Sequence, residues 1–136
     1  PLSTLKVVFI FSLFIAGVES QATADLRCVS KDRKLDIYHM YYHGDANQQH
    51  PHYSFKITYD STTFPEKNVS AHKFSDDLFI LELKSGNEMI FKVHAKADKS
   101  QDSDDLGEAY RVDQGFVTIQ KKKMNLKGIV IYCVLG

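Results

Sequence analysis

The sequence predicts an all-β domain, either a small antiparallel β-barrel or a β-sandwich of about seven strands, closed by one disulfide between its first and last strands. Three observations support this fold class. Short segments alternate between apolar and polar residues with a period of two, and turn-forming residues separate them. No stretch of more than about ten residues follows the 3.6-residue period of a helix. The two cysteines lie near opposite ends of the 136-residue chain.

The first residues have the pattern of a secretory signal peptide. Lys6 precedes an apolar run at residues 7–16, and residues 18–20 (Val-Glu-Ser) form a small-x-small cleavage motif. The run is shorter than the ~20 apolar residues that a membrane-spanning helix needs. We therefore expect a signal peptide at residues 1–20, cleaved after this motif or after one of the two alanines that follow it. Residues 21–136 are then a single secreted, extracellular β domain.

The charge balance argues against nucleic acid and membranes as partners. The chain has 17 basic and 17 acidic residues, so its formal net charge is zero. A neutral protein has no overall field that would attract a polyanion or an anionic lipid surface. No motif for a cofactor is present, and none is expected.

Seven segments are expected to be strands. The clearest is 53–59, where large apolar residues alternate with polar ones, as in a strand with one buried face. The runs 78–83 and 129–135 are continuously apolar, which favours central strands covered on both faces. Gly115 interrupts the alternation of another strand and predicts a β-bulge. In chain order, the expected strands are 26–30, 35–43, 53–59, 78–83, 89–96, 110–119 and 129–135.

Turn-forming residues connect these strands. Gly86-Asn87 is the clearest hairpin signal, because both residue types adopt positive φ readily. Residues 30–33 are expected to be a polar turn, and residues 121–128 a basic turn. An acid-rich loop is expected at 99–105, and the segment 64–77 is where one short helical turn is expected.

The cysteines and the missing tryptophan favour a barrel over an immunoglobulin-like sandwich. In a secreted domain, Cys28 and Cys133 are expected to pair, which requires the first and last strands to lie side by side with Cα atoms within about 7 Å. An immunoglobulin domain has a full strand after its second cysteine, whereas only three residues follow Cys133 here, and the chain has no tryptophan. The Gly-x-Trp signature of lipocalins is also missing. A closed or nearly closed barrel is preferred, with a two-sheet sandwich as the alternative.

One N-glycosylation sequon is present, at Asn68-Val69-Ser70. It lies in a polar part of the chain, where a glycan could be accommodated in a secreted protein. We therefore predict a glycan on Asn68.

Four of the six histidines gather at residues 39–53, in the sequence HMYYHGDANQQHPHY. If residues 35–43 pair with 52–59, these histidines converge near the tip of a hairpin, where imidazoles could bind Zn²⁺ or Cu²⁺. The spacing matches no known metal motif, and no residue that would hold the imidazole rings in place is evident, so we expect an exposed hairpin tip and no metal site. A pH-sensitive contact surface is the alternative.

Catalysis is not expected. Both cysteines are assigned to a disulfide, and no serine occupies a nucleophile motif. The pairs Asp76-Asp77 and Asp104-Asp105 are interpreted as solvated loop charges, since adjacent residues in a strand face opposite ways. The acidic segment 98–108 does not follow the order of a calcium loop. The lysines at 121–123 are expected to protect an edge strand against aggregation.

The tyrosines that flank the histidines suggest a recognition surface. Tyrosine offers a large contact area at low entropy cost, and consecutive tyrosines in a strand cannot all be buried. We therefore predict a non-enzymatic binding module whose partner is an extracellular protein or glycan. The alternative is a lipocalin-like carrier of a small hydrophobic ligand. The expected binding residues are Tyr38, His39, Tyr41, Tyr42, His43, His50 and His52.

Overall fold

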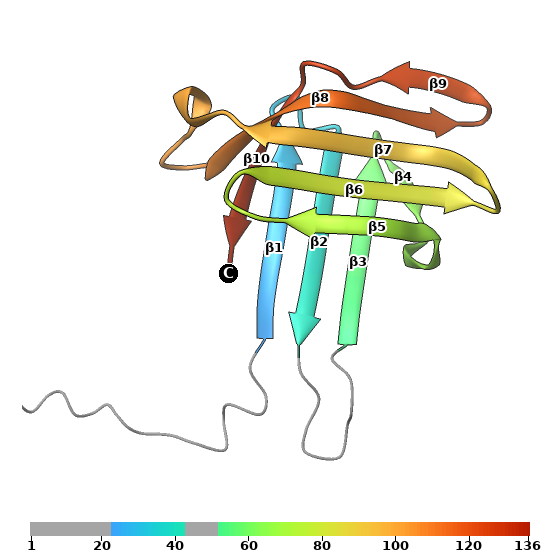
Figure 1. Cartoon of the computed structure of the whole chain (residues 1–136), viewed down its shortest axis with the longest axis horizontal. Coiled ribbons are helices and arrows are strands. Elements are labelled where there is room, and N and C mark those ends of the chain that lie inside the picture. Colours follow the sequence, from blue (N-terminus) through green and yellow to red (C-terminus); the bar gives the residue numbers. More distant parts are fainter. Residues whose placement is uncertain (1–22, 43–51) are drawn as a thin grey trace, which may run out of the picture.

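The computed structural model describes residues 23–42 and 52–136 (Figure 1). They form strands and two short 3₁₀ turns, η2 (Glu66–Asn68) and η3 (Lys99–Gln101). The strands are β1 (Thr23–Ser30), β2 (Leu35–Tyr42), β3 (His52–Tyr59), β4 (Thr62–Phe64), β5 (Val69–Phe74), β6 (Leu78–Ser85), β7 (Glu88–Ala97), β8 (Glu108–Ile119), β9 (Lys122–Asn125) and β10 (Val130–Leu135).

All the strands belong to one antiparallel sheet that curls into a half-barrel. The strand order is β4-β3-β2-β1-β10-β8-β7-β6-β5, and β9 pairs with β8 beside this path. In Figure 1, β1, β2, β3 and β10 run up and down, and β5 to β8 cross in front of them. The predicted all-β antiparallel class is confirmed. The predicted number of about seven strands is wrong, because the described residues form ten.

The predicted disulfide is confirmed. Cys28 on β1 and Cys133 on β10 are direct partners in the antiparallel register, and their sulfur atoms are bonded. Their Cα atoms are 4.1 Å apart, below the upper limit of about 7 Å that the pairing requires. The bond joins the first described strand to the last one.

Three short strands were not expected from the sequence. β3 turns into β4 through Asp60-Ser61, and β8 turns into β9 through Gln120-Lys121, with positive φ at all four residues. Turns of this kind usually contain glycine or asparagine, so neither turn has a recognisable hairpin signal. The third unexpected strand is β5, which follows the 3₁₀ turn η2. That turn confirms the short helical turn expected within 64–77.

The core lies inside the curl of the sheet. On β6, Phe79, Leu81 and Leu83 are buried, while the residues between them are only half-buried on the outer face. The expectation that both faces of this apolar strand are covered is therefore wrong. On β10 the expectation holds for its first four residues, which are all buried, but not for Val134 and Leu135, which are exposed.

The predicted bulge is present near Gly115. His94 pairs with Gln114 and Ala95 pairs with Val112, so Asp113 is the extra residue on β8. A Cβ atom on Gly115 would lie 2.8 Å from the carbonyl oxygen of Lys92, which explains why glycine occupies this position next to the bulge.

Within the described ranges, no helix is both long enough and apolar enough to cross a membrane.

Candidate functional site

The histidine- and tyrosine-rich segment forms the predicted hairpin. β2 pairs with β3, with Tyr41 opposite Tyr53 and Tyr42 opposite His52. The loop at 43–51, which contains His43 and His50, lies outside the described residues. The side chains of Tyr41, Tyr42 and His52 are likewise outside the described part of the structure. Of the predicted binding residues, only Tyr38 and His39 have described side chains, and the others on β2 and β3 are located by strand pairing alone.

Tyr38 and His39 lie on opposite faces of β2. The Tyr38 hydroxyl donates a hydrogen bond of 2.9 Å to the carboxylate of Asp25 on β1, and this bond is the main reason why the pKa of Tyr38 is raised. His39 faces the interior and is only 7% exposed. Its ring stacks on Phe55 with a centroid distance of 4.1 Å. His39 is therefore not part of the outer surface to which Tyr38 belongs, because neighbouring residues of a strand point to opposite faces.

The buried His39 ring packs in an aromatic group that reaches the surface at His72 on β5. His72 and Phe74 of β5 lie 5.5 and 5.4 Å from its ring centroid. Burial is the largest cause that lowers the pKa of His39, and the nearby His72 lowers it further, while a hydrogen bond with the Ser54 backbone acts in the opposite direction. Among the described residues, no group of three or more histidine, cysteine or carboxylate side chains is arranged to hold a metal ion.

Among the described residues, a larger cleft lies elsewhere, between the end of β10 and the turn that joins β5 to β6. It has a volume of about 680 Å³, within the range of roughly 300–1,000 Å³ that is typical of small-molecule sites. We name it the acidic cleft. Its floor is apolar and consists of Leu26, Phe74, Tyr110 and the Cys133 end of the disulfide. Leu135, which is 76% exposed, lies at its edge.

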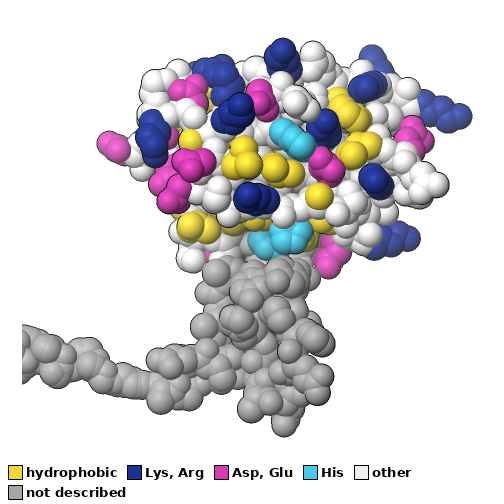
Figure 2. Space-filling view, in the orientation of Figure 1, with side chains coloured by type: hydrophobic (Ala, Val, Ile, Leu, Met, Phe, Trp, Pro, Cys, Tyr) yellow, Lys and Arg dark blue, Asp and Glu magenta, His cyan; other side chains and the backbone are white. Residues whose placement is uncertain are grey.

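Carboxylates surround this apolar floor. Asp76 lies in the β5–β6 turn, Asp102 and Asp104 lie in the loop before β8, and Glu108 begins β8. No lysine or arginine is among the described residues that line the cleft. In Figure 2, acidic side chains gather at the left edge of the view, on the side where Figure 1 places the β5–β6 turn and the loop before β8. The cleft therefore has a negative potential at its rim.

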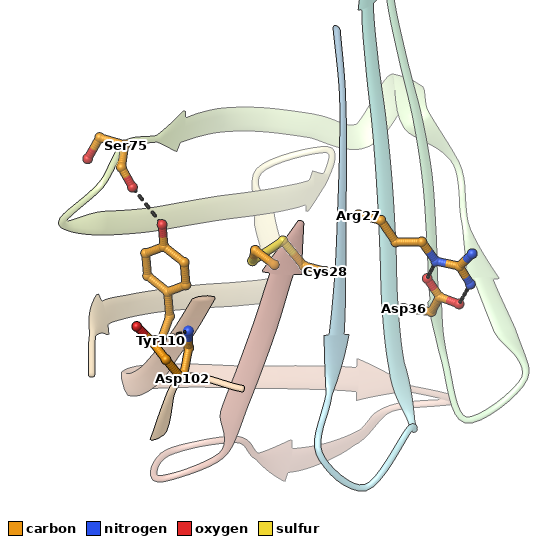
Figure 3. The surroundings of a disulfide bond; sticks show 8 residues. Arg27, Cys28, Asp36, Ser75, Asp102 and Tyr110 are labelled. Carbon is orange, nitrogen blue, oxygen red and sulfur yellow. Dashed lines mark hydrogen bonds and ion pairs between the residues drawn. A yellow bond between two sulfur atoms is a disulfide. The ribbon is translucent and has the colours of Figure 1, made fainter. Parts of the chain in front are cut away.

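Tyr110 connects the floor of the cleft to its wall. Its hydroxyl donates a hydrogen bond of 2.8 Å to the carbonyl oxygen of Ser75, so the tyrosine holds the β5–β6 turn in place (Figure 3). Burial raises the pKa of Tyr110, and the negative charges of Glu108, Asp76 and Asp102 raise it further. The carboxylates around the cleft therefore act on the Tyr110 hydroxyl.

The loop before β8 is shaped by specific hydrogen bonds. The Asp102 carboxylate accepts a 2.8 Å hydrogen bond from the backbone N–H of Ala109, and Ser103 and Gly107 exchange two backbone hydrogen bonds. Gly107 has a φ of 109°, and a Cβ atom there would lie only 2.4 Å from the carbonyl oxygen of Cys133. Glycine thus allows the loop to pack directly on β10 and to form one side of the acidic cleft.

A second, smaller cleft of about 390 Å³ lies on the other face of β1 and β10. Its lining includes Arg27, Lys31 and Arg33, and Val134 borders both clefts. Arg27 is already paired with Asp36 at 2.8 Å (Figure 3). This second cleft is lined by both basic and acidic side chains, so it favours neither sign of charge in a ligand, whereas the acidic cleft favours a cation.

Sequence reasoning missed the acidic cleft. Its carboxylates come from the β5–β6 turn and from the loop before β8, two segments for which the sequence predicts only solvated charges. The pairing of β6 with β7 places Asp77 beside Ala97, so it brings the β5–β6 turn next to the loop before β8. The hairpin signal at Gly86-Asn87 predicts this pairing, but no pattern in the sequence indicates that the end of β10 packs beside these segments to form a cleft. Gly107 at the end of the acidic loop is a local hint, because glycine permits a close approach of two backbones.

Comparison with known proteins gives no relative for this chain: no protein-family model, no curated protein and no solved structure matches it.

Proposed function

We propose that this chain is a secreted, non-catalytic binding protein that holds a small amphipathic cation in the acidic cleft. The observation that supports this function is the combination of an apolar floor with a rim of four carboxylates and no basic side chain among the described lining residues. An apolar body would lie on Phe74 and Tyr110, and an ammonium group would lie at the rim. The proposal keeps the idea of a carrier but places the ligand in a cleft, since large side chains such as Phe79, Phe91 and Leu81 fill the interior.

The two parts of the cleft would contribute differently to affinity. Burial of apolar surface stabilises a complex by roughly 25 cal/mol per Å², so the apolar body supplies most of the free energy of binding. A single exposed ion pair contributes only about 0.2–1 kcal/mol. Several carboxylates acting on one ammonium group add to each other, and they repel anions of the same shape. The rim would therefore set the charge specificity of the cleft.

Secretion is supported by two independent features. The first residues have the pattern of a signal peptide, and Cys28 and Cys133 form a disulfide, which is typical of proteins in oxidising compartments.

Three probes of similar shape and different charge test the ligand class. The full mature chain is titrated with 2-phenylethylammonium, 2-phenylethanol and 3-phenylpropionate by calorimetry at low ionic strength. We expect the cation to bind at least about tenfold more tightly than the neutral probe, a difference of about 1.4 kcal/mol. The preference should shrink as salt is added, because the rim is open to solvent. Equal binding of all three probes, or no binding of the cation, would overturn the proposal.

Matched variants locate the site. Asp76→Asn combined with Glu108→Gln removes two rim charges and should weaken binding of the cation about tenfold without changing the neutral probe. Asp60→Asn removes a carboxylate in the β3–β4 turn, and asparagine tolerates the positive φ of 48° at that position. This control should bind like the wild type.

The β2–β3 hairpin is a second candidate site, for an extracellular protein or glycan. Its support is the register, which places Tyr42 opposite His52 and Tyr41 opposite Tyr53, so that aromatic and imidazole residues occupy both strands. Replacement of Tyr42 by serine should abolish capture of such a partner and leave binding of the 2-phenylethylammonium probe unchanged.

A further inference from the structure

The two ends of the half-barrel meet at one short turn. In the strand order, β4 is the last strand on one side and β5 is the last on the other, and η2 (Glu66–Asn68) connects them along the chain. Among the described strands, β4 pairs only with β3, and β5 pairs only with β6. Each therefore presents one row of backbone N–H and C=O groups that no described strand pairs. Such edges can pair with the edge of another molecule and cause aggregation.

These two edges carry little charge. β4 has the sequence TTF and β5 has the sequence VSAHKF, so Lys73 is their single lysine or arginine and neither strand has an acidic residue. β9 is different, because Lys122 and Lys123 lie on it and Lys121 lies in the turn before it. Lysines on an edge strand prevent pairing between molecules. β9 thus carries the lysines that are expected to protect an edge strand, whereas β4 and β5 together carry one lysine.

The sequon lies where these two poorly charged edges meet. Asn68 is the last residue of η2 and directly precedes β5. It is partly exposed, and the third residue of the sequon, Ser70, is exposed on the edge strand itself. The backbone N–H of Asn68 bonds to Pro65 and the Ser70 hydroxyl bonds to the Glu82 carbonyl, so the segment has a fixed place beside both edges.

We propose that a glycan on Asn68 covers the open edges of β4 and β5 and keeps the protein monomeric. This inference depends on the secretion proposed above but not on the ligand of the acidic cleft. The side-chain amide nitrogen of Asn68 forms a bond to the anomeric carbon of an oligosaccharide carried on a lipid diphosphate. The bond from that carbon to the diphosphate oxygen breaks, its electron pair leaves with the diphosphate, and the amide loses one proton. The hydrated, bulky sugar then occupies the space that the strand of a second molecule would need.

The test uses the full chain secreted from eukaryotic cells that make high-mannose glycans. Intact-mass measurement of the secreted wild type should show one glycan, and Asn68→Gln should remove it. The glycan of the folded wild type is also trimmed to a single sugar with an endoglycosidase, which leaves residue 68 an asparagine derivative. Sedimentation velocity over a concentration series then reports self-association. We expect the trimmed wild type and Asn68→Gln to associate at concentrations at least about tenfold lower than the untrimmed wild type.

Two further variants separate the edge effect from a general effect of substitution. Asn87→Gln changes an exposed asparagine in the β6–β7 turn, which is not part of a sequon, and it should stay monomeric. Ser70→Lys in the Asn68→Gln background puts a charge on the edge of β5 and should restore the monomer.

A wild type that carries no glycan at Asn68 would overturn the inference. So would a trimmed wild type that stays as monomeric as the untrimmed protein, and this arm does not depend on the folding of any variant. Binding of the 2-phenylethylammonium probe is measured separately, so failure of this inference and failure of the proposed function are distinguishable.

Discussion

Cys28 on β1 lies directly opposite Cys133 on β10, with their Cα atoms 4.1 Å apart, and the bond between them spans the place where the two halves of the sheet meet. Among the described strands, the β1–β10 ladder is the one hydrogen-bonded pair that connects β1–β4 with β5–β10. The two cysteines are separated by 105 positions in the sequence. The disulfide therefore reinforces the joint on which the whole half-barrel depends.

Removal of this bond should destabilise the fold strongly. We expect the double variant Cys28→Ala/Cys133→Ala to lose about 2–4 kcal/mol of the free energy of unfolding, since the crosslink closes a long loop and restricts the unfolded chain. Urea denaturation followed by circular dichroism measures the loss, with reduced wild type as the control that keeps both sulfur atoms. A double variant as stable as the oxidised wild type would show that the β1–β10 ladder needs no covalent support.

The strands that could be predicted from the sequence are those with strong local signals. The hairpin at Gly86 was predicted because glycine favours the positive φ of 64° that this turn adopts. The turn through Asp60-Ser61 also requires positive φ, but its two residues adopt positive φ only at an energetic cost. No residue pattern therefore predicted the turn or the strand β4 that follows it. The turn at Gln120-Lys121 was missed for the same reason, and β9 with it.

The candidate site was less predictable than the fold because it is defined by tertiary contacts. Alternation along β2 predicts that Tyr38 and His39 face opposite sides, but not which of them is buried. The choice depends on Phe55 and His72, which come from two other strands and pack on the His39 ring. The acidic cleft likewise needs residues of β1 and β10, such as Leu26 and Leu135, which no local pattern places beside the acidic loop.

Replacement of Gly107, which borders the acidic cleft, by alanine should destabilise the folded protein more than the same change at Gly86. In Gly107→Ala the new Cβ would lie 2.4 Å from the Cys133 carbonyl oxygen, at a φ of 109°. Gly86→Ala is the matched control, because it also has positive φ but its Cβ meets open space. We expect Gly86→Ala to cost about 1–2 kcal/mol and Gly107→Ala to cost more than that. Thermal unfolding of the two variants compares the costs, and equal losses would show that the loop adjusts freely over β10.

Asp102 should have a structural role that can be separated from its charge. Its carboxylate accepts a hydrogen bond from the N–H of Ala109, a residue that is 1% exposed. Asp102→Ala leaves that donor unpaired and should cost about 1–3 kcal/mol of the free energy of unfolding, whereas Asp102→Asn keeps an oxygen acceptor and should cost less.

Asp102→Asn should also lower the pKa of Tyr110, because the negative charge of Asp102 is one of the causes that raise it. Titration of the Tyr110 ring by NMR measures the pKa. An unchanged value, with Asp60→Asn as reference, would contradict a shared electrostatic environment.

The stability of the half-barrel should decrease as the pH falls from about 7 to 5, and His39 should account for part of the decrease. Burial lowers the pKa of His39 in the folded protein, and the adjacent His72 lowers it further. In the unfolded chain, His39 takes up its proton near the ordinary histidine pKa of about 6.5. Below that pH the unfolded state binds more protons than the folded state, so the free energy of unfolding falls until the pKa of the folded state is reached. His39→Phe keeps an aromatic ring against Phe55 and removes the proton site, so its stability should depend less on pH. Urea denaturation at several pH values between 7 and 5 compares the two proteins. If the free energy of unfolding depends on pH equally in both proteins, the His39 ring can take up a proton within the folded aromatic group. The packing of β2 against β5 would then be loose enough for water to reach that ring.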